Sequence, residues 1–104
     1  MTAERGDCYE AAWKLIDGMS EVGATLVHGK PVGTGEENNG IRFGHAWVEL
    51  SIAILDPSNG KLVMVLRDEY YKVGKIRAKD NRVYTREEAM LRAVETGTFG
   101  PWDD

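Results

Sequence analysis

Residues 43–50, FGHAWVEL, place one of the chain's two histidines on a predicted strand. Side chains alternate between the two faces of a strand. One face carries Phe43, His45, Trp47 and Glu49. The other face carries Gly44, Ala46, Val48 and Leu50. The small and aliphatic face is expected to pack on the core, which leaves His45 on a mixed face, either as a hydrogen-bonded structural residue or as part of a site.

Length and composition limit the classes of protein to consider. The chain has 104 residues, 42% of them hydrophobic and 29% charged, enough for one core and too few for two ordinary domains. We therefore expect one domain over residues 1–104. The net charge of −4, without a basic run, argues against a nucleic-acid partner. No stretch approaches the roughly 18 to 20 apolar residues of a membrane span, so the sequence predicts a cytoplasmic protein without a membrane partner.

The stretch GDCYEAAWKLIDGMSEVG (6–23) predicts a helix that carries the only cysteine. Asp7 is the expected N-cap, with Glu10 three residues later. Cys8 then lies in the first turn, on the apolar face of the helix, where the helix dipole and the exposed backbone N–H groups favour a thiolate. A lone cysteine is either a small buried residue or a candidate nucleophile.

After this helix the hydrophobic pattern changes to the two-residue period of strands. The expected strands are 24–29, 41–50, 52–56 and 61–66. The polar, Gly-rich loop 29–40 has a length often found in binding segments. Asn59-Gly60 is a tight-turn signal, so the last two strands should form an antiparallel hairpin, with Asp56 at a strand end.

The C-terminal third predicts a second group of elements. RDEYYKVG (67–74) indicates a short helical turn, and KIRA (75–78) and RVY (82–84) indicate a strand or a hairpin. Thr85 and Glu88 form a capping box for a helix that ends at Gly97. The final FGPWDD should fold back and bury Phe99 and Trp102. The sequence thus predicts an α+β domain in which helices flank a mostly antiparallel sheet.

Four motifs, DCYEAAWKL, ATLVHG, GHAWVEL and ILDPSNGK, follow one another within residues 6–61. In this order they resemble the signature of the transglutaminase-like branch of the papain-type cysteine protease fold. The resemblance implies a papain/transglutaminase-like core, with an N-terminal helix carrying the cysteine packed on the sheet. Thr25 departs from the pattern, because members commonly carry Arg there, and only seven residues precede Cys8 to supply the usual oxyanion donor.

The resemblance also implies roles for individual residues. Cys8 would be the nucleophile, His45 the general base and later acid, and Asp56 the group that orients the imidazole. The backbone N–H of Cys8 and the side chain of Asn38 or Asn39 are the candidate oxyanion donors. Trp47 joins the two asparagines as a candidate for substrate contact.

The expected activity is that of a thiol-dependent amide hydrolase or acyl transferase acting on a protein or peptide amide, without a cofactor. A zinc site is not expected, because Cys8, Asp56 and the two histidines lack close ligand spacing. His28, beside the polar loop, is expected at the surface.

Two alternatives stay open: a cell-wall peptidase of the NlpC/P60 type, and a non-catalytic binding domain that retains the fold. The sequence leaves the substrate, the choice between hydrolysis and transamidation, and the oligomeric state open.

Overall fold

The computed structural model describes residues 5–20, 22–33, 39–57 and 60–103. In this part of the chain, three α-helices and five strands form an α+β domain. The helices are α1 (Arg5–Asp17), α2 (Arg67–Gly74) and α3 (Arg86–Thr96), with a short 3₁₀ turn, η2, at Ala78–Asp80. The strands are β1 (Thr25–Gly29), β2 (His45–Glu49), β3 (Ala53–Asp56), β4 (Val63–Leu66) and β5 (Arg82–Thr85).

The strands form one antiparallel sheet in the order β4-β3-β2-β1-β5. β2 is the central strand and pairs with β1, where Val27 is opposite Trp47. The expected pairing of β3 with β4 is confirmed, with Asp56 opposite Val63. Gly60, which precedes β4, has a φ of 72°, a left-handed conformation that glycine adopts without strain. The predicted fold class, α+β with an antiparallel sheet, is therefore confirmed.

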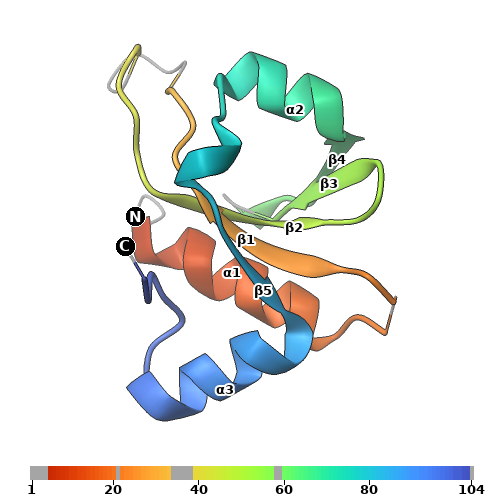
Figure 1. Ribbon diagram of the computed structural model, residues 1–104, viewed down its shortest axis with the longest axis vertical. Helices are drawn as coiled ribbons and strands as arrows, with labels where there is room; N and C mark the ends of the chain where they lie inside the picture. The colour runs from red at the N-terminus through yellow and green to blue at the C-terminus, as the bar shows by residue number, and fades with distance from the viewer. Residues whose placement is uncertain (1–4, 21, 34–38, 58–59, 104) are drawn as a thin grey trace.

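The helices cover both faces of the sheet. Figure 1 shows α1 and α3 on one side and α2 on the other. One core cluster joins α1 to the first face through Ala12, Ile16, Ala46 and Val48, as expected from the alternation in FGHAWVEL. A second cluster on the opposite face joins Trp47, Val27 and Ile54 to residues of α2. The expectation of a single core face is thus incomplete, because β2 is buried on both sides.

Several predicted boundaries differ from the structure. The helix begins at Arg5, so Asp7 lies inside it and the predicted N-cap is wrong. β2 begins at His45, four residues after the predicted start of the strand. Before it, Arg42 forms an isolated bridge to Val32. The stretch 75–78 is not a strand; it leads into the 3₁₀ turn η2. Helix and strand ends depend on tertiary contacts, so local patterns place them poorly.

The end of the chain confirms two predictions. Thr85 Oγ1 accepts the backbone N–H of Glu88, and the Glu88 carboxylate accepts that of Thr85, which completes the capping box of α3. Phe99 and Trp102 fold back as partly buried residues against the core cluster on α1.

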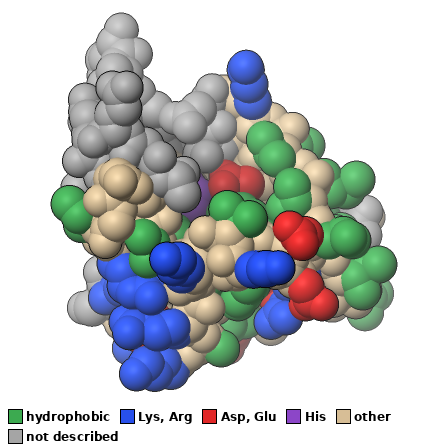
Figure 2. All heavy atoms as spheres, turned by 90° about the horizontal axis from the view of Figure 1, so that it is seen from above, with side chains coloured by type: hydrophobic (Ala, Val, Ile, Leu, Met, Phe, Trp, Pro, Cys, Tyr) green, Lys and Arg blue, Asp and Glu red, His purple; other side chains and the backbone are tan. Residues whose placement is uncertain are grey.

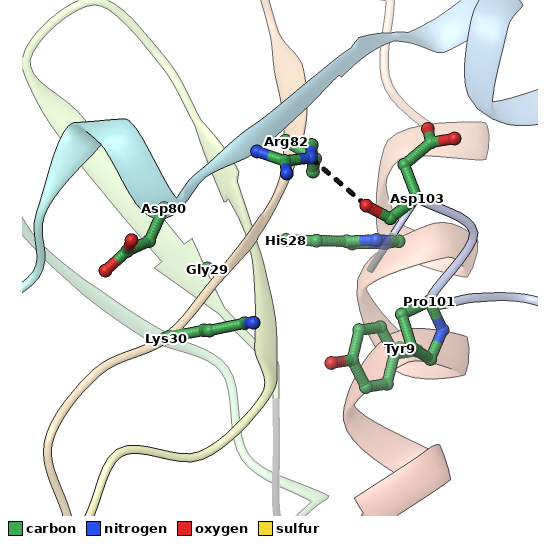
Figure 3. Close-up of a pocket in the computed structure, with 8 residues that line it drawn as sticks. All are labelled: Tyr9, His28, Gly29, Lys30, Asp80, Arg82, Pro101 and Asp103. Carbon is green, nitrogen blue, oxygen red and sulfur yellow. Dashed lines mark hydrogen bonds between the residues drawn. The ribbon is translucent and has the colours of Figure 1, made fainter.

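His28 is buried, so its predicted surface position is wrong. Only 5% of its surface is exposed, and its ring packs against those of Tyr9, Tyr84 and Trp102. Figure 3 shows His28 between β1 and the C-terminal segment, where Arg82 donates a hydrogen bond to the backbone oxygen of Asp103. The segment after α3 thus covers this end of β1 and the outer strand β5.

None of the helices in the described part of the chain has the length and apolar composition needed to cross a bilayer.

Candidate active site

Three elements position the residues expected to form the site. Cys8 lies in the first turn of α1, His45 is the first residue of β2, and Asp56 is the last residue of β3. β2 and β3 are antiparallel neighbours, so the start of one and the end of the other lie at the same end of the sheet. Cys8 and His45 are both buried, and Asp56 is half-buried.

The His45 ring connects the other two side chains. Its Nε2 lies 2.9 Å from Asp56 Oδ2, a hydrogen bond in which the ring donates to the carboxylate. Cys8 is the second side-chain hydrogen-bond partner of this ring. The structure therefore brings together the three residues that the sequence selected.

The surroundings of His45 favour its charged form. Burial is the largest single influence and opposes the charge, but hydrogen bonds and charges from Asp56 and Cys8 outweigh it and raise the pKa of His45 to about 9. Asp56 contributes more to this increase than Cys8 does. At neutral pH the imidazole therefore holds a proton between a carboxylate and a thiol.

Tyr70, which sequence reasoning did not select, supports the carboxylate. Its hydroxyl donates to Asp56 Oδ2 over 2.7 Å, so one carboxylate oxygen accepts from both Tyr70 and His45. Burial, followed by the charge of Asp56 and its hydrogen bond, raises the pKa of Tyr70, which keeps the phenol protonated as a donor. Tyr70 therefore acts as a positioning residue for Asp56. Its only sequence signal was a tyrosine pair in a short helix outside the four motifs.

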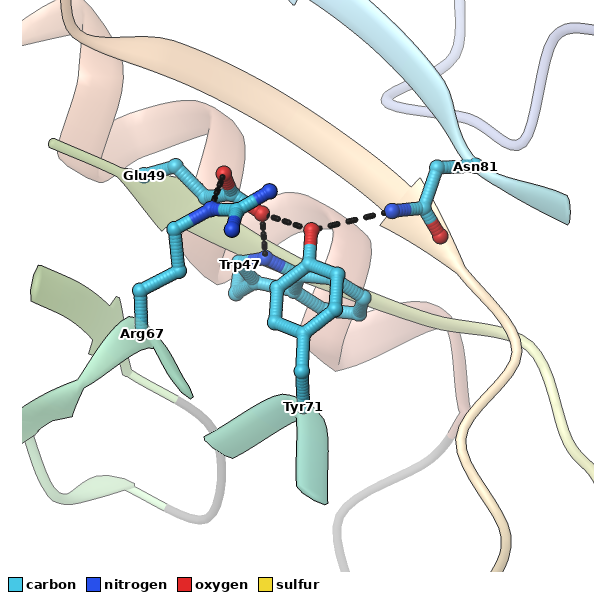
Figure 4. Close-up of polar contacts among 5 residues, drawn as sticks. All are labelled: Trp47, Glu49, Arg67, Tyr71 and Asn81. Carbon is cyan, nitrogen blue, oxygen red and sulfur yellow. Dashed lines mark hydrogen bonds and ion pairs between the residues drawn. The ribbon is translucent and has the colours of Figure 1, made fainter. Parts of the chain in front are cut away.

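A half-buried carboxylate, Glu49, fixes α2 over the sheet (Figure 4). Its two oxygens accept from Trp47 Nε1 and Arg67 Nε, each at 3.0 Å, and the Tyr71 hydroxyl also donates to it. Asn81 donates to the Tyr71 hydroxyl at 3.0 Å. Since Arg67 and Tyr71 belong to α2, these bonds hold the helix that carries Tyr70 in place.

A pocket of about 190 Å³ opens beside His45 and Asp56. Its other walls are mostly apolar and come from residues 31–32, from Phe43, and from α2 and the residues after it; they include Val32 and Val73. Figure 2 shows a histidine next to an acidic side chain at the bottom of a hollow. The pocket is smaller than the roughly 300 Å³ at which small-molecule sites begin, so it suits one side chain of a larger ligand.

The three residues expected to contact substrate have different positions. Trp47 has no exposed surface and therefore offers nothing to a substrate in this structure. Its ring packs against Tyr70 at 5.2 Å between centroids, which makes it a support beneath the site. Asn39 is exposed and pairs with Gly33 in an isolated bridge. Asn38 lies outside the described residues.

In the described part of the chain, no group of three or more His, Cys, Asp or Glu side chains has the arrangement of a metal site. No protein-family model, no curated protein and no solved structure matches the chain.

The raised pKa of His45 predicts how stability depends on pH. A group whose pKa is higher in the folded state stabilises the fold below its unfolded value of 6.5, and this stabilisation is lost as the pH rises through about 9. The unfolding free energy should thus fall by an amount on the order of 3 kcal/mol across this range, as measured by denaturant unfolding.

Asp56→Asn separates this effect from other titrations. It removes the largest contribution that raises the His45 pKa, so the fall in stability above pH 6.5 should become shallower. Asp17→Asn, at an exposed position on the last turn of α1, is the matched control and should keep the wild-type slope. Equal slopes for all three proteins would contradict a His45–Asp56 ion pair.

Proposed function

We propose that this protein is a thiol-dependent amide hydrolase or acyl transferase, with Cys8 as nucleophile, His45 as acid and base, and Asp56 as the residue that orients His45. One observation carries the proposal: a buried imidazole bonded to a carboxylate on Nε2 and to a thiol as its second partner. A carboxylate on one ring nitrogen fixes the tautomer and orientation that proton transfer at the other nitrogen requires.

The first half of the reaction forms a thioester. The Cys8 sulfur, as thiolate, attacks the carbonyl carbon of the amide, and the C–N bond then breaks as the His45 proton moves to the leaving nitrogen. The His45 pKa of about 9 suits this step, because the ring carries the required proton at neutral pH. Asp56 stabilises the imidazolium before the transfer.

The second half resolves the thioester. Neutral His45 now accepts a proton from water or from an amine as that group attacks the thioester carbonyl, and the Cys8 thiolate leaves. Water gives hydrolysis and an amine gives transamidation, so the acceptor that reaches the pocket decides the product. The oxyanion donors in this proposal are the Cys8 backbone N–H and an asparagine of the 38–39 pair.

The fold assignment within this proposal is a small member of the transglutaminase-like branch of the papain-type fold. Its support is the order of elements: a helix with the cysteine, a strand, a second strand that starts at the histidine, and a third that ends at the aspartate. The substrate would be a protein or peptide amide, since the small apolar pocket suits one side chain of a longer chain.

One observation favours a second candidate, a non-catalytic binding domain. Cys8 is only 8% exposed and belongs to the core cluster with Ala12 and Ile16, as a purely structural cysteine would. The cell-wall peptidase of the NlpC/P60 type has no comparable observation in its favour.

Alkylation by iodoacetamide tests the proposal without a substrate. A thiolate held by His45 should react at pH 6 nearly as fast as at pH 9, whereas the rate of an ordinary thiol with a pKa near 8.5 falls on the order of a hundredfold over this range. His45→Ala should restore that steep fall, and Asp56→Asn should do so in part. The measurement is the rate of mass labelling between pH 4 and 10.

The same series identifies the alternative. A structural cysteine would label slowly at every pH until guanidinium unfolds the chain, and His45→Ala would then leave the profile unchanged. That result would overturn the catalytic proposal in favour of the binding domain. Because the chain has one cysteine, every thiol label reports on Cys8.

A further inference from the structure

The two edges of the sheet differ in how they are protected. β5 begins with a charged residue, Arg82, and the C-terminal segment covers it through hydrogen bonds from Arg82 and Tyr84 to Asp103. β4 has the sequence VMVL, with no charge and no proline. Exposed edge strands present unpaired backbone groups, and proteins usually blunt them with charges, prolines or a covering segment. β4 carries none of these among the described residues.

Large apolar side chains gather around this unprotected edge. Of the exposed large apolar residues that the structure describes, more than half lie on β4, beside it or on the flank of α2. They are Ile52, Leu62, Val63, Met64, Leu66 and Val73. Figure 2 shows apolar side chains concentrated on the side of the molecule where β3 and β4 lie in Figure 1. Large apolar side chains exposed along an uncovered edge strand mark an interaction surface.

We propose that β4 pairs antiparallel with β4 of a second copy of this chain, so that two five-stranded sheets become one. A two-fold axis perpendicular to the sheet relates the strands of such a pair, and each copy contributes the same surface. This symmetry places both α2 helices on the same face of the joined sheet. Val73, 63% exposed on α2, then faces the α2 helix of the other copy.

The charges that flank β4 complement one another under this symmetry. Lys61 precedes the strand, and Asp68 and Glu69 follow it in the first turn of α2. Antiparallel pairing brings the start of one strand to the end of the other, so Lys61 of each copy approaches the acidic pair of its neighbour. All three side chains are exposed, and no ion pair within the described residues engages any of them.

The size of the patch also fits a second copy. Six half-exposed or more exposed side chains, at roughly 100 Å² each, offer at most on the order of 1,200 Å² of apolar surface for burial over two copies, which is the lower end of stable interfaces. A patch of this size predicts a dimer of moderate affinity. The proposal does not depend on the activity of Cys8.

Sedimentation velocity over a concentration series tests the dimer. The wild type should convert from monomer to dimer as concentration rises, and Met64→Lys or Leu66→Lys should weaken the dimer by on the order of tenfold or more, since the two copies then bring like charges close together across the axis. Val94→Lys is the matched control: Val94 is 82% exposed on α3, away from β4, and this variant should dimerise like the wild type.

A charge swap tests the register. Lys61→Glu alone should weaken the dimer, and the combination with Asp68→Lys and Glu69→Lys should restore it, because complementarity returns with the signs reversed. Any one of four results would overturn the proposal. The wild type could stay monomeric at every concentration, or form open-ended assemblies instead of a dimer. The charge swap could fail to restore the dimer, or Val94→Lys could weaken it as much as the β4 variants do. Circular dichroism confirms that each variant is folded.

Discussion

Replacing Cys8 by alanine should abolish acylation of the protein by p-nitrophenyl acetate while leaving the fold stable. In the proposed mechanism the Cys8 sulfur forms a thioester with this activated ester, so p-nitrophenol release should fall to the uncatalysed rate in the variant. Cys8 is a small side chain in the first turn of α1, so its loss should change the unfolding free energy by only about 1 kcal/mol. Intact mass, p-nitrophenol release and denaturant unfolding provide the three measurements.

His45→Ala distinguishes a catalytic pair from a merely accessible thiol. It keeps the sulfur but removes its hydrogen-bond partner, so acylation should slow on the order of a hundredfold or more. An acyl adduct on the Cys8→Ala protein would show that another residue is modified. Unaltered acylation in His45→Ala would show that the imidazole does not assist the thiol.

The fold class was predictable because its elements carry local signals. The helical period of apolar residues after Cys8, the alternation in FGHAWVEL and the capping box at Thr85 each arise from residues a few positions apart. The order of strands in the sheet carries no such signal. β5 joins β1 across more than fifty residues of sequence, and only tertiary packing decides that neighbour.

The candidate triad was selected from motif order, and the structure places its members in contact. Tyr70 could not be selected in the same way. Its hydrogen bond to Asp56 exists because α2 folds back over the sheet, and that arrangement depends on Glu49 binding Arg67 and Tyr71. Residues that act through distant contacts leave no spacing pattern in the sequence.

The positions of His28 and Trp47 differed from expectation for one shared reason: each is covered by a segment distant in sequence. The C-terminal segment covers His28, and α2 covers Trp47. Alternation correctly placed Trp47 on the face opposite Ala46 and Val48, but it could not show that this face is also a core. Trp47 therefore changes from a candidate for substrate contact to a structural residue.

Trp47→Ala should consequently cause a large loss of stability. The indole is fully buried, contacts both tyrosines of α2 and donates to the Glu49 carboxylate that anchors this helix. Truncating a buried tryptophan costs about 3 to 5 kcal/mol, a large fraction of the stability of a domain of this size. Urea unfolding at pH 6.5 measures the effect. Val94→Ala, on the exposed face of α3, should change stability by no more than about 0.5 kcal/mol.

Trp47→Phe separates the packing of the ring from its hydrogen bond. Phenylalanine retains most of the apolar contact with Tyr70 but leaves the Glu49 oxygen with one donor fewer, so its loss of stability should be smaller than that of alanine. A substrate-contacting tryptophan would behave differently: Trp47→Ala would retain wild-type stability and reduce only the rate of reaction with peptide esters. Because Tyr70 positions Asp56, a structural Trp47 predicts that stability and the pH dependence of alkylation change together in Trp47→Ala.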